Sequence, residues 1–383
     1  MKKTKEILWL GIDTDLFNRA PIIARNARIT AIVGNSPHEP GTCRKDNGIM
    51  TVRISGLPFL PSLSQGIFAA IFAIKNIREI NAVVTDYFGF IGALIIKEFH
   101  RNKPPIFLNI LSPPVCVHGI KGVLIHLYFK LVLVLSNRFA KQVFVLSENT
   151  KDIVALFFRD KDKITVTGLG INPAFITKPN KTQDMAIKAE LGIKNDETVL
   201  IYHGTLAPDR GLEEMLHAFA IASSTLKDQD LKLIIVGDGG LRRKLKSLNT
   251  HLNLDNQVFF CGWKSYEALP AYIEAADIAI VPMPENRNWS ISYKLLEYLA
   301  MGKPTIATDI EVNRLVDRGR GLVYFVKPER KSMAEAILHI ANNPELRKEM
   351  SRRATIVREE FDWRKSASRM TEAIIGAVGA VKG

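Results

Sequence analysis

Short apolar runs rich in β-branched residues alternate with stretches of helical pattern through the first half of the chain. The runs that we expect to be strands are Ile7–Gly11, Ile29–Val33, Met50–Ile54, Ala82–Thr85, Ile106–Asn109, Val143–Leu146 and Ile164–Thr167. The stretches that we expect to be helices are Asn18–Arg25, Ser62–Arg78, Gly89–Arg101, Val123–Ala140 and Thr150–Phe158. This alternation predicts an α/β fold with a doubly wound parallel sheet.

The second half repeats the same alternation. Its expected strands are Val199–His203, Leu233–Val236, Val258–Cys261, Ile278–Val281, Thr305–Ala307 and Val323–Phe325. Its expected helices are Leu212–Ser223, Leu241–Leu248, Tyr266–Glu274, Tyr293–Ala300, Met333–Ile340 and Pro344–Arg358, with a last helix from Trp363. Gly168–Pro179 has the aperiodic Gly, Asn and Pro content that is typical of a linker. Two similar halves predict a cleft that the carboxyl-end loops of both sheets face.

The composition is that of an ordinary folded protein, and the length favours two domains. Of the 383 residues, 47% are hydrophobic and 24% are charged, which argues against disorder. The formal net charge of +13 favours an anionic partner, but no zinc-finger, RRM or basic-region pattern points to nucleic acid. Cys43, Cys116 and Cys261 are too widely spaced for a metal signature or a disulfide framework, which indicates a reducing compartment.

Two apolar segments bear on membrane contact. Ile54–Ile74 has no charge and is long enough to span a bilayer, but prolines in its first half restrict the good helix to Ser62–Ile77. Gly119–Arg138 has basic residues interleaved among apolar ones, which fits either a helix in the membrane interface or a core helix with one wet edge. We expect peripheral membrane contact through 62–78 and 119–138. The N-terminal apolar run is too short for a signal peptide.

The segment Val281–Asp309 carries the clearest chemical pattern. It runs from the end of an apolar strand through a loop rich in Pro and Asn into a helix that Gly302 should close. Ser290 and Ser292 offer N-cap hydroxyls, and the free N–H groups at a helix start suit a phosphate. Glu297, about one turn further on, is near enough to meet a ribose diol. The alternative is a buried βαβ unit in which Glu297 is merely solvated.

Three further loops follow strands of the same predicted sheet. Gly204–Gly211 carries Arg210, a guanidinium able to clamp two phosphate oxygens or to lie in solvent. Gly237–Gly240 is a glycine turn, and Cys261–Lys264 offers an aromatic residue for a base or simply forms a turn. Combined with the helix that carries Glu297, these loops predict one nucleotide site.

These motifs make the second half resemble the nucleotide-sugar domain of group 1 (family 4) retaining glycosyltransferases, which have the GT-B fold. The resemblance covers roughly Val199 to Trp363 and rests on YHGTLAPDRGLEEMLHAF, LIIVGDGG, VFFCGW, YIEAADIAIVP and SYKLLEYLAMGKPTIATD. It implies a Rossmann-like acceptor domain at 1–170 and a Rossmann-like nucleotide-sugar domain at 171–362. It also implies that a closing helix at 363–383 packs back on the first domain.

Carried over residue by residue, the resemblance implies that Glu297 binds the ribose, and that Arg210 and Lys294 hold the diphosphate as the other two catalytic residues. The donor-binding residues that we expect are Gly204, Thr205, Arg210, Gly237, Gly262, Trp263, Asn288, Ser290, Ile291, Ser292, Tyr293, Lys294 and Glu297. Two positions depart from the family. Trp289 stands where the family often has a sugar-contacting glutamate, and Thr205 where it often has an arginine. No cofactor and no metal is expected, because no DxD pair stands in a donor loop.

The first half should bind the acceptor or the sugar. Gly11, Asp13 and Arg19 follow the first strand, although Asp13 fits ordinary helix capping as well. Asn109 and His118 lie at and beyond the end of a later strand, and the family often has a histidine on this side. Alternatively, His118 is a loop histidine with no role in binding.

We therefore expect a metal-independent retaining hexosyltransferase that moves a hexose or N-acetylhexosamine from a UDP- or GDP-sugar to a lipid-linked or polysaccharide acceptor. The expected location is cytoplasmic, peripheral on the inner face of the membrane. Three alternatives remain open: a UDP-sugar 2-epimerase-like enzyme, a basic lipid-binding module, and a non-catalytic partner subunit with the same fold. The departures at Trp289 and Thr205 support the last of these.

Overall fold

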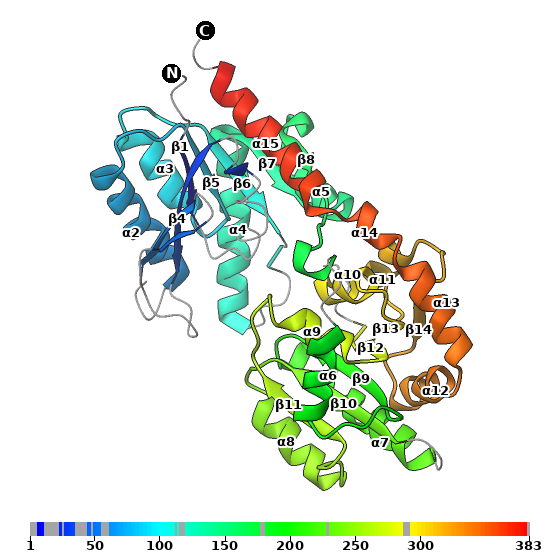
Figure 1. The fold of residues 1–383 in the computed structure, drawn as a ribbon. Helices are drawn as coiled ribbons and strands as arrows, with labels where there is room; N and C mark the ends of the chain where they lie inside the picture. Colours follow the sequence, from blue (N-terminus) through cyan, green and yellow to red (C-terminus); the bar gives the residue numbers. More distant parts are fainter. Residues whose placement is uncertain are drawn as a thin grey trace. The chain divides into compact units, whose positions relative to one another are not determined.

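The computed structural model describes residues 6–10, 23–24, 27–34, 44–46, 49–54, 61–111, 113–114, 119–176, 181–226, 230–285 and 292–380. They belong to two compact units (Figure 1). The first unit is Met1–Gly170 together with Trp363–Gly383, and the second is Ile171–Asp362. The second unit is therefore continuous in the sequence, whereas the first takes residues from both ends.

A mixed sheet in the order β3-β4-β2-β1-β5-β6-β7-β8 forms the centre of the first unit. Its strands are β1 (Glu6–Leu10), β2 (Arg28–Gly34), β3 (Arg44–Asp46), β4 (Ile49–Ile54), β5 (Ala82–Thr85), β6 (Ile106–Ile110), β7 (Ala140–Val145) and β8 (Ile164–Val166). The edge strand β3 runs antiparallel to β4, while the other described pairs are parallel. The fold class is therefore as expected, with one short antiparallel strand added at the edge of the sheet.

Helices cover both faces of this sheet, as its alternating residues require. Leu8 and Leu10 face a core shared with α2 (Pro61–Asn76), α3 (Phe90–Phe99), α4 (Gly119–Phe139) and α5 (Glu148–Ala155). Ile7 and Trp9 face the opposite core. That second core also contains side chains of α15 (Trp363–Ala380), the last helix of the chain. Because successive strand residues point to opposite faces, one buried strand serves both cores.

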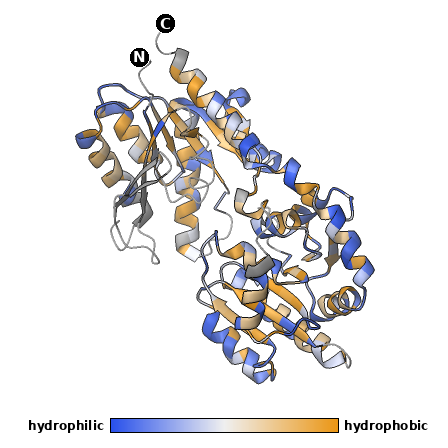
Figure 2. Cartoon of the chain, in the orientation of Figure 1, coloured by the Kyte–Doolittle hydropathy of each residue, from blue (hydrophilic) through white to orange (hydrophobic). Residues whose placement is uncertain are grey.

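The second unit has a six-stranded sheet in the order β11-β10-β9-β12-β13-β14, all parallel (Figure 1). The strands are β9 (Thr198–His203), β10 (Leu231–Val236), β11 (Val258–Gly262), β12 (Ile278–Val281), β13 (Thr305–Thr308) and β14 (Val323–Val326). The helices are α6 (Lys181–Glu190), α7 (Leu212–Thr225), α8 (Arg242–His251), α9 (Leu269–Glu274), α10 (Tyr293–Ala300), α11 (Glu311–Asp317), α12 (Arg330–Ala341), α13 (Pro344–Ala354) and α14 (Val357–Glu360). The strands are mostly hydrophobic and the outer helices carry the polar residues (Figure 2).

Most elements confirm the prediction within a few residues, and β5, β12 and α10 agree at both ends. The elements β3, α6, α11 and the short 3-10 turns were not predicted, and the single helix expected over Pro344–Arg358 is divided into α13 and α14. The N-cap expectation for α10 is only partly right, because Ser292 holds the N-cap position but its hydroxyl makes no capping hydrogen bond. The end of the helix is as expected, with Gly302 at φ +71°. The predicted helix Asn18–Arg25 lies mostly outside the described residues.

Backbone hydrogen bonds tie together the loops that follow β9, β10 and β11. The amide of Gly204 donates to Val236 at 2.9 Å, Leu206 donates to Asp238 at 2.9 Å, and Gly237 donates to Gly262 at 2.8 Å. Gly237 has φ +145°, and a Cβ atom there would overlap the carbonyl oxygen of Gly204. Glycine is therefore required at the point where two loops touch.

We expect Gly237→Ala to lower the free energy of unfolding of the second unit by about 2–4 kcal/mol, from a disfavoured backbone conformation plus steric overlap. Denaturant titration followed by circular dichroism measures this. Gly240→Ala in the same loop is the matched control, because a Cβ there meets nothing within 4 Å. Equal stability of the two variants would contradict the proposed contact between the loops.

Candidate active site

The strand order of the second unit fixes where a ligand would bind. Beginning at β9, the chain first builds outward through β10 and β11, then returns to add β12, β13 and β14 on the other side. The loops after β9 and β12 therefore leave the sheet in opposite directions, which opens a crevice at the carboxyl ends of the strands. Gly211 shows how closely the two loops approach, since a Cβ atom there would overlap the carbonyl oxygen of Pro282. This switch point is the candidate site.

Helix α10 brings two charged side chains to the switch point. Lys294 and Glu297 are one turn apart, and both are buried, with 9% and 4% of their surface exposed. Two charged groups are seldom buried on one short helix unless each has a partner. The reading of Glu297 as merely solvated is therefore wrong.

Lys294 lies on the ring of Tyr202, the second-last residue of β9. Its Nζ is 4.5 Å from the ring centroid and donates a hydrogen bond to the Tyr202 hydroxyl at 3.2 Å. Burial, and next the neighbouring Arg210 guanidinium, lower the pKa of Lys294 to about 7, against the opposing effect of Glu297 and Asp209. The positive charge expected at Lys294 thus depends on pH near neutrality.

Glu297 meets a histidine and a tyrosine that the sequence did not single out. Its Oε2 lies 3.1 Å from Nε2 of His203, the last residue of β9. Burial, and next the nearby Glu297 carboxylate, raise the pKa of Tyr266. The one signal that could have indicated His203 is its place at the carboxyl end of a central strand.

Arg210 lies near these groups, at the end of the short 3-10 turn Pro208–Arg210. Its charge is felt by both Lys294 and Tyr202. Its Nε is buried without a hydrogen bond and is 3.5 Å from Oδ1 of Asp209. Two cations close together, one with an unbonded buried donor, form a site that an anion would stabilise.

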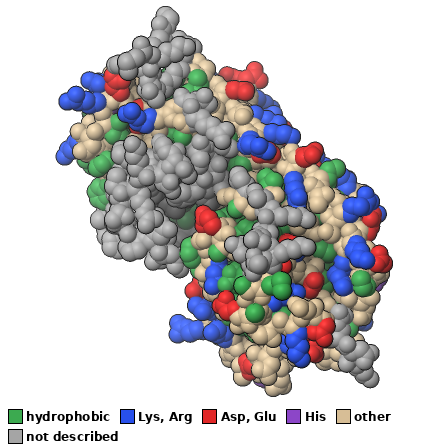
Figure 3. Space-filling model, in the orientation of Figure 1, with side chains coloured by type: hydrophobic (Ala, Val, Ile, Leu, Met, Phe, Trp, Pro, Cys, Tyr) green, Lys and Arg blue, Asp and Glu red, His purple; other side chains and the backbone are tan. Residues whose placement is uncertain are grey.

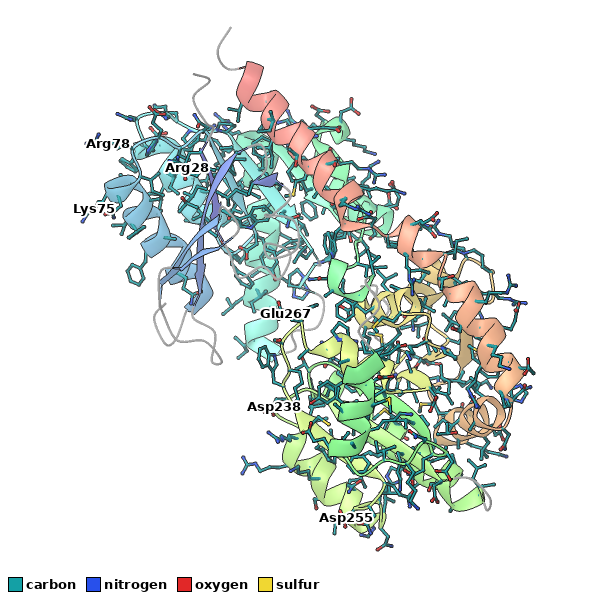
Figure 4. All side chains as sticks on the ribbon, viewed as in Figure 1. Arg28, Lys75, Arg78, Asp238, Asp255 and Glu267 are labelled. Atoms are coloured by element: carbon teal, nitrogen blue, oxygen red, sulfur yellow. The ribbon has the colours of Figure 1, made fainter. Side chains whose placement is uncertain are left out.

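The remaining donor candidates lie around this group. Gly204 packs against Lys294, with a hypothetical Cβ 3.1 Å from Cε and Nζ, while Thr205 is exposed. Gly237 and Gly262 form the loop junction described above, and Trp263 beside it is 52% exposed. Ser292 and Tyr293 lie at the start of α10. Asp238 lies in the loop after β10 (Figure 4) and pairs with Arg242 of α8 at 3.0 Å.

Several candidates lie outside the described residues: Asn288, Ser290 and Ile291 on the donor side, and Gly11, Asp13, Arg19 and His118 on the acceptor side. Trp289, the departure from the family pattern, lies outside them too. Asn109 is described and is buried in β6 of the first unit. No group of three His, Cys, Asp or Glu side chains in the described ranges is placed to hold a metal ion.

Two open grooves on the second unit have volumes of about 560 and 540 Å³. The larger lies between α7 and α8 beside Gly211, and the smaller lies beside the edge strand β11. Neither is lined by Lys294 or Glu297. The candidate site therefore rests on the chemistry and burial of its side chains rather than on cavity size.

Solved structures define the class of fold. The chain superimposes on sucrose-phosphate synthase from Thermosynechococcus elongatus with a TM-score of 0.79 at 17% identity, covering 98% of this chain and 100% of that one. It superimposes on Anabaena HepE in complex with UDP and glucose with a TM-score of 0.75 at 16% identity, covering 97% and 100%. The chain has the GT-B fold, as expected.

The sequence comparisons identify the family. Residues 183–357 match the model of glycosyl transferases group 1. Alpha-D-kanosaminyltransferase from Streptomyces kanamyceticus is 30% identical over 164 residues, which are 42% of this chain and 40% of that protein. Alpha-monoglucosyldiacylglycerol synthase from Acholeplasma laidlawii is 25% identical over 334 residues, 83% of this chain and 82% of that protein. The second unit is a group 1 glycosyltransferase domain, and the resemblance to that family is confirmed.

If Lys294 holds a diphosphate, donor binding should depend on pH. Below pH 7 its ammonium is present before binding, and above pH 7 binding must take up a proton. We expect the affinity for a nucleoside diphosphate to fall by up to about tenfold per unit between pH 7 and 9. Lys294→Arg keeps its charge and should show little slope. Calorimetric titration at several pH values measures both, and a flat wild-type profile would remove Lys294 from the diphosphate.

Proposed function

We propose that this protein transfers a hexose or N-acetylhexosamine, with retention, from a UDP- or GDP-sugar to a lipid-linked or polysaccharide acceptor. The observation that carries the proposal is the group at the switch point of the second unit, in which Glu297 and Lys294 are buried and Arg210 is half-buried. A carboxylate for a ribose beside two cations for a diphosphate matches both halves of a sugar nucleotide. The UDP held by the structural neighbour HepE supports this choice of ligand.

The reaction breaks the bond between the anomeric carbon and the diphosphate oxygen, so negative charge develops on the leaving group. Lys294, Arg210 and the N–H groups at the start of α10 are placed to stabilise that charge electrostatically. In a retaining transfer the acceptor hydroxyl approaches the same face, and the departing phosphate accepts its proton. This scheme assigns no protein side chain as the base and requires no metal.

The acceptor side of the proposal rests on α4. Six large aliphatic side chains on one face of this helix are between 49% and 83% exposed: Ile120, Val123, Leu124, Leu127, Leu131 and Val134. Lys130 and Arg138 are exposed beside them, and the helix contains no acidic residue. A bilayer with anionic lipids matches such a face. Figure 2 shows the hydrophobic character of α4 along most of its length.

The other candidate for membrane contact contributes less. Helix α2 exposes only Phe68 and Ile71 among its large described apolar residues, at 40% and 44%. Lys75 and Arg78 at its end point outward (Figure 4). One described helix, in the window Gly122–Phe139, is apolar and long enough to cross a membrane, and 28% of it is buried. We place α4 on the inner face of the cytoplasmic membrane rather than through it, because its opposite side packs in the core of the first unit.

We expect one of UDP, GDP, ADP and CDP to raise the melting temperature of the protein, since a ligand of the native state stabilises it. Glu297→Ala should lower the affinity for that nucleotide by about 10- to 100-fold, because charge-assisted hydrogen bonds to the ribose are lost. Glu335→Ala, an exposed residue of α12, is the control. Stabilisation by none of the four would disprove the nucleotide site. Nucleotide binding without donor hydrolysis or sugar transfer would instead favour the non-catalytic partner.

We expect the protein to float with vesicles of phosphatidylcholine and phosphatidylglycerol, and less with phosphatidylcholine alone. The double substitution Leu127→Glu with Leu131→Glu should lower binding on the order of a hundredfold, because two apolar side chains no longer favour the bilayer. Leu156→Glu, at a leucine of the first unit that is 83% exposed and lies outside α4, is the control. Unchanged flotation of the double variant would exclude α4 as the contact.

A further inference from the structure

His203 occupies a position that the proposed chemistry has not yet used. It is the last residue of the central strand β9, and its side chain is only 8% exposed. Two contacts with Tyr298 of α10 fix it. Its backbone N–H donates to the Tyr298 hydroxyl at 2.7 Å, and the two rings meet edge to face at 4.8 Å between centroids. A buried imidazole held by its backbone and its ring has little freedom to turn.

The free edge of this imidazole lies against Glu297. Nε2 is 3.1 Å from Oε2, yet the direction falls short of a hydrogen bond, and Nε2 has no other partner in the described part of the chain. Contacts of this kind often become well aligned only when the ligand is bound. Tyr266 also lies close to Glu297: burial, and next the Glu297 carboxylate, raise the pKa of its hydroxyl. Glu297 is therefore flanked by two polar groups from outside its own helix.

We propose that His203 positions the Glu297 carboxylate for a vicinal diol, and that this makes the site selective for ribonucleotides over 2′-deoxyribonucleotides. The inference rests on the proposed function, because it takes Glu297 as the ribose-binding group. His203 is a positioning residue, since it acts on the ligand through Glu297.

The selectivity follows from the fixed orientation. A carboxylate that is free to rotate can turn an unused oxygen towards water, so the loss of one ligand hydroxyl costs little. A buried carboxylate with the His203 imidazole 3.1 Å from one oxygen has less freedom to rotate, so its oxygens stay aimed at the hydroxyls of the diol. A 2′-deoxy ligand then leaves a buried charged oxygen without its donor, and such sites discriminate strongly against the analogue that lacks the hydroxyl.

The test compares dissociation constants of a ribonucleoside diphosphate and its 2′-deoxy analogue, measured by calorimetry with the full chain. UDP and GDP with their 2′-deoxy forms are the probes. We expect the wild type to prefer the ribonucleotide by about tenfold or more, and Glu297→Gln to lose most of that preference. His203→Ala should reduce the preference to within about threefold. His203→Gln, whose amide can donate from nearly the same place, should restore it.

A control variant and four outcomes separate the role of His203 from the existence of the nucleotide site. His100, the C-cap residue of α3 in the first unit, is another buried histidine. His100→Gln should leave the preference for the ribonucleotide unchanged. If Glu297→Gln abolishes the preference while His203→Ala retains it, the nucleotide site stands and the role of His203 is overturned. If His203 were only structural, His203→Ala would weaken the binding of the ribonucleotide and of its 2′-deoxy analogue equally. That result would also overturn the positioning role of His203. If the wild type binds neither nucleotide, both proposals fail. If it binds the ribonucleotide and its 2′-deoxy analogue equally well, the nucleotide site stands and only the proposed selectivity fails.

Discussion

The contact of Lys294 with Tyr202 is the interaction on which the site depends. An ammonium removed from water is unstable unless something replaces its hydration, and here an aromatic face and a phenolic hydroxyl do so. The contact joins the first residues of α10 to the end of β9, across the switch point of the sheet. It also explains Gly204, because a larger residue would press on the lysine side chain. A substitution at Tyr202 would thus disturb the helix, the loop and the charge together.

Charge balance around this contact gives the site its character. Burial and the Arg210 guanidinium lower the pKa of Lys294, and Glu297 and Asp209 oppose that effect. The free protein therefore holds cations that are incompletely neutralised at neutral pH. Basic side chains are spread over the visible surface of both units (Figure 3), so an anion approaches through a generally favourable field. The specificity must come from the buried residues, since the exposed charges do not select one anion over another.

Much of the fold could be predicted because buried parallel strands are continuous apolar runs, and the second unit has six of them in order. The short, polar helices α6 and α11 were not predicted. Their helical structure depends on tertiary contacts more than on a periodic pattern of hydrophobic residues. Loop motifs indicated Glu297, Lys294 and Arg210. They could not indicate that Lys294 is buried on Tyr202, or that His203 reaches Glu297, because these contacts join residues nearly a hundred positions apart. Such pairs are set by strand order, which local sequence does not encode.

The chain passes between the two units twice, at Gly170–Ile171 and at Asp362–Trp363, and this has a consequence for the order of folding. Ile171 and Asp362 form a β-bridge at the boundary of the second unit, and the ring of Trp363 packs on Gly170 in the first. The second unit is thus inserted into the first, whose opposite core includes Met370, Ile374 and Val378 of α15. During synthesis the ribosome releases every residue of the inserted unit before it delivers that helix. The first unit therefore cannot close this core until α15 has left the ribosome, which is after the whole inserted unit has been made.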